Sequence, residues 1–335
     1  MGKLFGVSYA LRGNAYHIAE SGLIQWFNLK IPPTKNGYPV VAIDEMAFIS
    51  NTDICSLTLP SSIRTIGKYA FQKCTALRTA VIEAGDIGDR AFMECKNLHT
   101  VVLGEGVTSI GKEAFKGCKK LKSVTLPNSL TSLAQGAFFE CPNIEYINIP
   151  TSMTVIENNS FFYFKNVRRF HIHKWVSRIE DGAFAYCNSV EQYTVDEENP
   201  FFKAINGDLY TKDGSTLIAY ASGKKDTEFL VPEGVLHIGM AACAGSASLK
   251  SIELPEGVIS IKFEAFGLCP SLESVTIPRS VTDVDRSICW QSNKNVTFFW
   301  YFSERPEGWD ESWNDLDFDN KASVVRKKMG KSVLD

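Results

Sequence analysis

The sequence predicts an α/β repeat solenoid, because one residue pattern recurs along most of its 335 residues. A leading apolar residue, numbered position 0 of each coil, occurs ten times between residues 43 and 284. Of the nine steps between these residues, seven are 23 residues long, one is 21 and one is 59. The leading residues are Ile43, Ile66, Ile87, Ile110, Leu133, Ile156, Ile179, Ile238, Ile261 and Val284. One coil alone buries too little apolar surface, so stacked neighbours have to supply a continuous core.

Other positions of the coil repeat in phase with the leading residue. Phe stands at position 5 in eight of the ten coils, after a small residue at position 4. Apolar residues at positions 14 and 16 alternate with a polar one, as in Val124-Thr125-Leu126, which predicts a strand with one buried face. Between positions 0 and 11 the apolar residues lie three to five apart, which favours a short helical or 3₁₀ turn.

This pattern predicts strands at eleven pairs of positions 14 and 16, from Leu57 and Leu59 to Phe298 and Trp300. A further strand is expected near Leu29 and Ile31. The same register buries the ring at position 5 between its counterparts in the two neighbouring coils. We therefore expect Phe115 to lie between Phe92 and Phe138, and Val124 and Leu126 to point inward.

The repeat, written IGKEAFKGCKKLKSVTLP over residues 110–127, resembles that of the BspA-like leucine-rich repeat family. The resemblance covers about residues 40–300. It implies a right-handed solenoid arc with a parallel β-sheet on the concave side. Many bacterial members look like secreted or surface proteins that bind host or matrix proteins, so the resemblance also implies protein binding and cell adhesion.

The chain divides by this register into three parts. Residues 1–40 are expected to form an N-terminal cap, residues 41–300 the repeats, and residues 301–335 a C-terminal cap with a basic tail from Lys321. The 59-residue step contains an extended coil at about residues 196–232. There, Asp213-Gly214 between two β-prone runs predicts one inserted β-hairpin.

Composition and charge exclude several classes of protein. Lys and Arg number 35 and Asp and Glu 38, so the formal charge of −3 argues against general nucleic-acid binding. No run of 18 apolar residues predicts a membrane span. The N-terminus lacks the features of a signal peptide, which predicts a cytoplasmic protein as written. Removal of a native signal would make it secreted or surface-exposed, as the family resemblance implies.

The nine cysteines are expected to be free thiols without metal or disulfide roles. Six occupy position 8, where Asn51, Phe164, Ser246 and Ser292 stand in other coils. The six are Cys74, Cys95, Cys118, Cys141, Cys187 and Cys269. A slot that also takes Ser and Asn favours packing or a backbone hydrogen bond over sulfur chemistry. No Cys and His spacing predicts a zinc site, and we expect no cofactor.

A candidate partner-binding patch lies on the strand around residue 170. Positions 13, 15 and 17 should face outward on the sheet, and most coils carry small or neutral residues there. The patch is expected to consist of Tyr146, Asn148, Arg169, His171, His173, Gln192 and Thr194. Arg, Tyr and Trp are common anchors of protein interfaces. The alternatives are a metal held by His171 and His173, an anionic ligand or nucleic acid, and chance variation at exposed positions.

The sequence therefore predicts a non-catalytic, monomeric scaffold that presents a rigid concave sheet to a protein partner. The alternative is a structural or self-associating repeat protein without a small-molecule site. No phosphate-binding loop or nucleophile elbow occurs, so no catalytic residue is proposed.

Overall fold

The computed structural model describes residues 7–21, 27–317 and 320–326, and in these residues strands alternate with turns and no helix occurs. The chain separates into two compact units, residues 1–183 and 184–335, each of which is described by itself. No helix able to cross a membrane is found in the described part of either unit. The three-part division at residues 40 and 300 stays a prediction.

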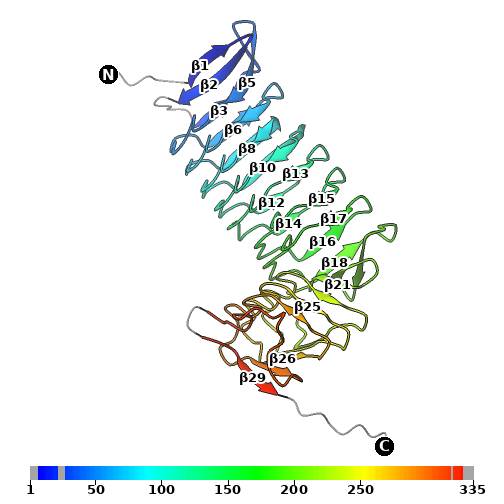
Figure 1. The fold of residues 1–335 in the computed structure, drawn as a ribbon. Helices are drawn as coiled ribbons and strands as arrows, with labels where there is room; N and C mark the ends of the chain where they lie inside the picture. Colours follow the sequence, from blue (N-terminus) through cyan, green and yellow to red (C-terminus); the bar gives the residue numbers. More distant parts are fainter. Residues whose placement is uncertain (1–6, 22–26, 318–319, 327–335) are drawn as a thin grey trace, which may run out of the picture. The chain divides into compact units, whose positions relative to one another are not determined.

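Unit 1 contains a parallel sheet, the first sheet, built from positions 14 and 16 of successive coils (Figure 1). Its strands in spatial order are β14 (Tyr146–Ile147), β12 (Ser123–Val124), β10 (Thr100–Gly106), β8 (Thr79–Ala84), β6 (Ser56–Leu59) and β3 (Asn28–Lys30). In the next coil, β16 (Arg169–Ile172) carries the same positions. Val124 and Leu126 are buried, as the register predicts.

Position 0 and the residue before it form a second parallel sheet in unit 1. Its parallel strands are β5 (Tyr38–Ile43), β7 (Thr65–Ile66), β9 (Asp86–Ile87), β11 (Ser109–Ile110) and β13 (Ser132–Leu133). The strands β15 (Val155–Ile156) and β17 (Arg178–Ile179) pair in the same way. The sheet begins with an antiparallel hairpin of β1 (Val7–Arg12) and β2 (Ala15–Ser21), and β4 (Thr34–Lys35) folds back on β5.

The expected helical or 3₁₀ turns, and with them the α/β class, are wrong: the described chain is an all-β solenoid. Positions 3 and 7 carry the left-handed backbone conformation in each of the ten coils, as at Glu113 (φ 54°) and Gly117 (φ 74°). A left-handed residue every fourth position interrupts a right-handed helix. The backbone bonds to the next coil instead, and Phe115 N–H donates to Ala137 O at 2.7 Å.

Position 5 forms a continuous stack of rings inside unit 1. Phe48, Phe71, Phe92, Phe115 and Phe138 are buried, with neighbouring ring centroids 4.8, 5.0, 5.1 and 5.2 Å apart and planes within 8° of parallel. This spacing matches the distance between neighbouring strands, so each coil contributes one ring per step. The prediction that Phe115 lies between Phe92 and Phe138 is confirmed.

The thiols at position 8 bond to the backbone of the preceding coil. Cys118 Sγ donates to Phe92 O at 3.3 Å, and Cys141 Sγ donates to Phe115 O at 3.1 Å. Ser292 Oγ makes the same bond to Phe266 O at 2.6 Å. The predicted packing and hydrogen-bonding role is confirmed, and all nine cysteines are free thiols. Burial raises the pKa of Cys118 well above its usual value and that of Cys269 to about 12.

Unit 2 repeats the two-sheet arrangement after an extended coil. Positions 14 and 16 lie first on β18 (Gln192–Val195). They then form a separate parallel sheet of β22 (Glu228–Leu230), β24 (Ser251–Glu253), β26 (Ser274–Ile277), β28 (Thr297–Trp300) and, in the closing segment, β29 (Ser323–Arg326). Its second sheet, in spatial order, is β19 (Phe202–Ile205), β20 (Asp208–Thr211), β21 (Thr216–Ala219), β23 (His237–Ile238), β25 (Ser260–Ile261) and β27 (Asp283–Val284). A first-sheet strand is thus observed at each of the eleven expected positions.

The inserted hairpin is confirmed as β20 and β21, which pair antiparallel around Asp213-Gly214. A second hairpin, β19 with β20 around Asn206-Gly207, precedes it and was not predicted. At the base, the buried Asp208 carboxylate accepts bonds from Ala221 N–H and from Lys224 Nζ, both at 2.8 Å. Burial raises the pKa of Asp208 in spite of these two donors.

The closing segment of unit 2 adds most of a further coil. Trp309 forms a parallel β-bridge to Val284 and so stands where the next position 0 would be. Trp309 and Trp313 are buried, with ring centroids 4.9 Å apart, and β29 supplies the matching first-sheet strand. The tail residues after Arg326 lie outside the described residues.

We expect Phe115→Ala to lower the free energy of unfolding by roughly 3–5 kcal/mol, as for other large core truncations. The substitution removes one ring from the middle of the stack and leaves its two neighbours without that contact. Urea unfolding followed by circular dichroism measures the change. A midpoint equal to that of the unmodified protein would contradict the stack as a source of stability.

At position 8, Cys118→Val should be about 1 kcal/mol less stable than Cys118→Ser. Val keeps the apolar volume but removes the donor to Phe92 O, whereas Ser supplies a hydroxyl donor, as Ser292 does in its own coil. Thermal unfolding of the two variants side by side makes the comparison. Greater stability of the Val variant would show that packing alone decides this position.

Candidate functional site

The predicted patch residues divide between the two units. Tyr146, Asn148, Arg169, His171 and His173 belong to unit 1, whereas Gln192 and Thr194 belong to unit 2. In unit 1, Tyr146 stands opposite Ser123 in the parallel pairing of β14 with β12 and is 57% exposed. Its ring therefore projects from the first sheet where the coil before it has only a hydroxymethyl group.

Asn148 holds the sheet together and does not project as a free binding group. Its Nδ2 donates to Leu126 O at 2.9 Å, and its Oδ1 accepts from Leu126 N–H at 2.7 Å. The side-chain amide thus makes both hydrogen bonds that a neighbouring strand would make. Because the Asn148 side chain takes the place of backbone partners, β12 and β14 are only two residues long.

His173 does not lie on the open face, contrary to expectation. It is only 6% exposed, its Nε2 lies 3.0 Å from Pro150 O, and its Nδ1 accepts from Trp175 N–H at 3.2 Å. These two bonds require the neutral tautomer with the proton on Nε2. His173 stands at position 17, where Pro150 and Pro127 end the strands before it, so it closes the turn by bonding to backbone.

Arg169 and His171 do lie outward on β16, because Phe170 and Ile172 between and after them are buried. Trp175, two residues after His173, is 58% exposed, and Lys174 Nζ lies 5.3 Å from the centroid of its ring. The sheet patch of unit 1 thus consists of Tyr146, Arg169 and His171, and Trp175 lies in the turn after β16.

In unit 2, Gln192 is exposed and Thr194 half-buried on β18, on either side of the buried Tyr193. Tyr193 N–H donates to Gly207 O at 2.8 Å, so the turn between β19 and β20 lies against β18. A role for Gln192 and Thr194 in partner binding stays a prediction.

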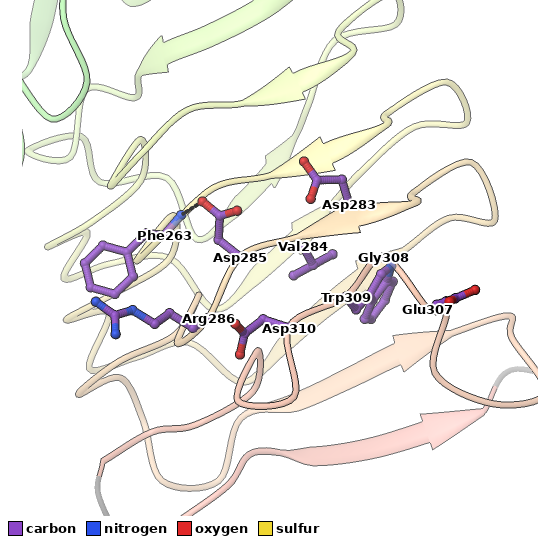
Figure 2. Close-up of a pocket in the computed structure, with 9 residues that line it drawn as sticks. All are labelled: Phe263, Asp283, Val284, Asp285, Arg286, Glu307, Gly308, Trp309 and Asp310. Carbon is purple, nitrogen blue, oxygen red and sulfur yellow. Dashed lines mark hydrogen bonds between the residues drawn. The ribbon is translucent and has the colours of Figure 1, made fainter.

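A cavity of about 540 Å³ lies in unit 2, beside the closing segment (Figure 2). Its lining residues are Phe263, Asp283, Val284, Asp285, Arg286, Glu307, Gly308, Trp309 and Asp310. Several of its charged groups already have structural partners. Asp285 Oδ2 accepts from Phe263 N–H at 3.0 Å, and Lys262 Nζ lies 2.8 Å from Asp283 Oδ2.

The remaining side chains of this cavity also hold the closing segment. Asp310 Oδ1 accepts from Ser312 N–H at 2.8 Å and from Ser312 Oγ at 2.7 Å, which lowers the pKa of Asp310. Arg286 lies over the Phe263 ring at 5.2 Å. The cavity therefore lies where the closing segment packs against the last regular coil.

Across the residues that the structure describes, no three His, Cys, Asp or Glu side chains lie together in a metal-binding arrangement.

Charge is divided unevenly between the two units. Unit 1 has 20 Lys and Arg residues against 15 Asp and Glu residues, a formal charge of +5. Unit 2 has 15 against 23, a formal charge of −8. The total of −3 conceals a basic and an acidic unit, and a separate count for each half of the sequence shows it.

Comparison with known proteins identifies the repeat. The model of the BspA type leucine rich repeat region matches residues 27–86, 85–205 and 219–303 in six copies. The chain belongs to this family. The matched residues contain the strands from β3 to β19 and from β22 to β28, and the family resemblance inferred from the sequence is confirmed.

Solved structures with the same architecture come from several bacteria. The chain is 27% identical to a leucine rich cell surface protein from Faecalibacterium prausnitzii A2-165, with a TM-score of 0.72 over 90% of this chain and 94% of that one. A leucine-rich repeat protein from Eubacterium ventriosum is 22% identical, with a TM-score of 0.55 over 89% and 71%. The pneumococcal vaccine antigen PcpA is 16% identical, with a TM-score of 0.57 over 98% of each chain, and shows the fold alone.

A search of curated proteins finds no match. Family and fold are those of leucine-rich repeat scaffolds, which are generally non-catalytic.

The turn between β20 and β21 contains the Asp213 carboxylate, and the pKa of Asp213 reports on the hydrogen bonds of this turn. Hydrogen bonds from Thr211 Oγ1 at 2.6 Å and from the N–H and Oγ of Ser215 at 2.9 Å lower the pKa of Asp213 to about 2. Because the folded pKa lies below the unfolded value, the stabilisation is complete above about pH 4 and is lost as pH falls toward 2.

We expect Thr211→Val to raise the pKa of Asp213 toward its ordinary value, since Val cannot donate to the carboxylate. Carboxyl-carbon NMR titration measures this pKa. Asp310, whose carboxylate is held by Ser312, serves as an internal control and should not move. An unchanged Asp213 pKa in the variant would contradict the bond from Thr211.

Proposed function

We propose that this BspA-type repeat protein is a non-catalytic scaffold that binds a protein partner on the first sheet, in the manner of an adhesin. The proposal rests chiefly on the sheet patch of unit 1. Tyr146, Arg169 and His171 project there, while Ser123 and Thr125 of the preceding strand are small. Large aromatic and guanidinium groups on an ordered surface are what protein interfaces use as anchors.

The backbone beneath the patch supports this proposal. Hydrogen bonds from Asn166 Nδ2 to Pro142 O and between His173 and Pro150 O hold the coil of β16 against that of β14. Alternate residues of β16 are buried, so the outward side chains start from a fixed strand. Such preorganisation lowers the entropy lost on binding. The similarity to a leucine rich cell surface protein supports a partner met at a surface.

We expect Arg169→Ala with His171→Ala to weaken partner binding by on the order of 1–3 kcal/mol and to leave stability nearly unchanged. The unmodified protein, immobilised as bait, captures its partners from a protein extract of the environment in which the source organism lives. Quantitative mass spectrometry identifies the captured proteins. Biolayer interferometry then measures their affinity for each variant.

The matched control is Ser123→Ala with Thr125→Ala, two exposed positions of the same sheet. Equal affinity of the two double variants for the captured protein would remove the sheet patch as the binding site. It would leave the assignment to the family untouched.

Self-association is a second candidate, favoured by the last strand of unit 2. In β29, Val324 and Val325 are 37% and 45% exposed, and no further strand pairs with β29 among the described residues. An open edge with apolar side chains is a template for another chain. Light scattering behind size exclusion over a range of concentrations separates a monomeric binder from an assembling protein.

A further inference from the structure

The turn side of unit 1 carries a second surface that the sheet patch does not include. A notch of about 380 Å³ crosses three neighbouring coils there. It is lined by Lys119, Phe139, Glu140, Pro142, Tyr163 and Lys165, and we call it the lysine notch. Lys119 and Lys165 both stand at position 9, two coils apart, and so flank the notch on opposite sides.

The walls of the lysine notch are aromatic rings that lie outside the core. Phe139 and Tyr163 meet edge to face with centroids 5.4 Å apart, and both are half-buried. Phe162 lies 5.3 Å from Phe139 on the same side. Within unit 1, position 6 is aromatic only in these two coils, and the preceding ones have Ile49, Gln72, Met93 and Lys116 there. An apolar side chain of a ligand would find partly exposed ring surface here.

Positive charge surrounds these rings. Lys165 Nζ lies 4.5 Å from the centroid of Tyr163, and Lys119 is exposed with no ion pair in the described part of the chain. Lys120 and Lys122, also exposed, follow on the same coil. In contrast to Lys119, Lys116 is paired, because Glu113 Oε1 lies 3.0 Å from its ammonium group. Glu140 is the only carboxylate that lines the notch, within a unit whose formal charge is +5.

We propose that the lysine notch binds an acidic segment of a protein partner, with an apolar side chain in the notch and flanking carboxylates on Lys119 and Lys165. The inference rests on the proposed function, in that the ligand is a protein, but it uses a different face from the sheet patch. The charge of the rim selects an anionic ligand. The aromatic walls favour a peptide over a polymer of phosphates, since the peptide supplies a large side chain that fills the notch.

A synthetic peptide tests the proposal without knowledge of the partner. The probe is a fluorescein-labelled pentapeptide with a central phenylalanine between two pairs of glutamates. Fluorescence anisotropy against the full chain should show saturable binding that weakens as salt is added. Replacing the phenylalanine of the probe by glycine should weaken binding, because the notch then stays unfilled.

The variant is Lys119→Gln with Lys165→Gln, which we expect to weaken binding of the probe roughly tenfold. The control is Lys30→Gln with Lys112→Gln, which removes the same charge from exposed positions of the same unit outside the notch. Equal binding by the two double variants, equal binding of the phenylalanine and glycine probes, or no saturable binding would each overturn the proposal.

The result is separate from that of the sheet-patch experiment. If binding of a captured partner depends on Arg169 but the acidic probe does not compete with it, the proposed function stays in place and the lysine notch is ruled out as its binding site. Concentration-dependent dimers that the Lys119 and Lys165 variant abolishes would also overturn the peptide proposal, in favour of a second copy of this chain as the occupant.

Discussion

The hydrogen bond from one coil to the next is the interaction on which the rest of this structure depends. In the coil that starts at Ile87, N–H groups at positions 3, 5 and 7 donate to carbonyls at positions 2, 4 and 6 of the following coil, at 2.9, 2.7 and 2.7 Å. The N–H groups at positions 4, 6 and 8 donate within their own coil, three residues back, at 3.1–3.2 Å. The turn segment therefore satisfies its donors without a helix. The left-handed residues cost about 1–2 kcal/mol each, which the cross-coil bonds offset.

Side-chain order follows from this backbone. Because successive coils are bonded in register, equal positions lie one strand spacing apart and form ladders. The rings at position 5 stack, and the thiols at position 8 reach the carbonyl of position 5 in the preceding coil. That carbonyl also accepts the N–H of position 8 in its own coil, so both of its lone pairs are used. Position 8 therefore requires a small side chain that donates a hydrogen bond, and sulfur is not essential. In five coils a Cys thiol donates to the backbone carbonyl, and in its own coil the Ser292 hydroxyl makes the same bond.

The sequence pattern predicted the strands, the ring stack and the hairpin at Asp213-Gly214, because each depends on residue type at a fixed spacing. It did not predict the form of the turns, since apolar residues three to five apart suit a helix as well as successive turns. Left-handed positions filled by Glu113 or Tyr163 carry no glycine to reveal them. The hairpin at Asn206-Gly207 carried a strong turn signal that was overlooked. In the candidate site, alternation placed Arg169 and His171 correctly but not His173, whose ring bonds to backbone that only the folded chain brings near.

Departures from the repeat around residue 165 separate into two kinds. Phe164, which replaces the thiol, is buried with its ring 6.2 Å from that of Phe161, and Ser160 Oγ bonds to Glu157 O at 2.8 Å. His173 replaces a strand-ending proline by bonding to Pro150 O. These three changes are explained by packing or by hydrogen bonds to backbone. Arg169 and His171 project outward, where neither the core nor the cross-coil backbone bonds require a large side chain. Packing and backbone hydrogen bonds thus explain the buried departures, and the exposed ones are the departures that the proposed partner contact would explain.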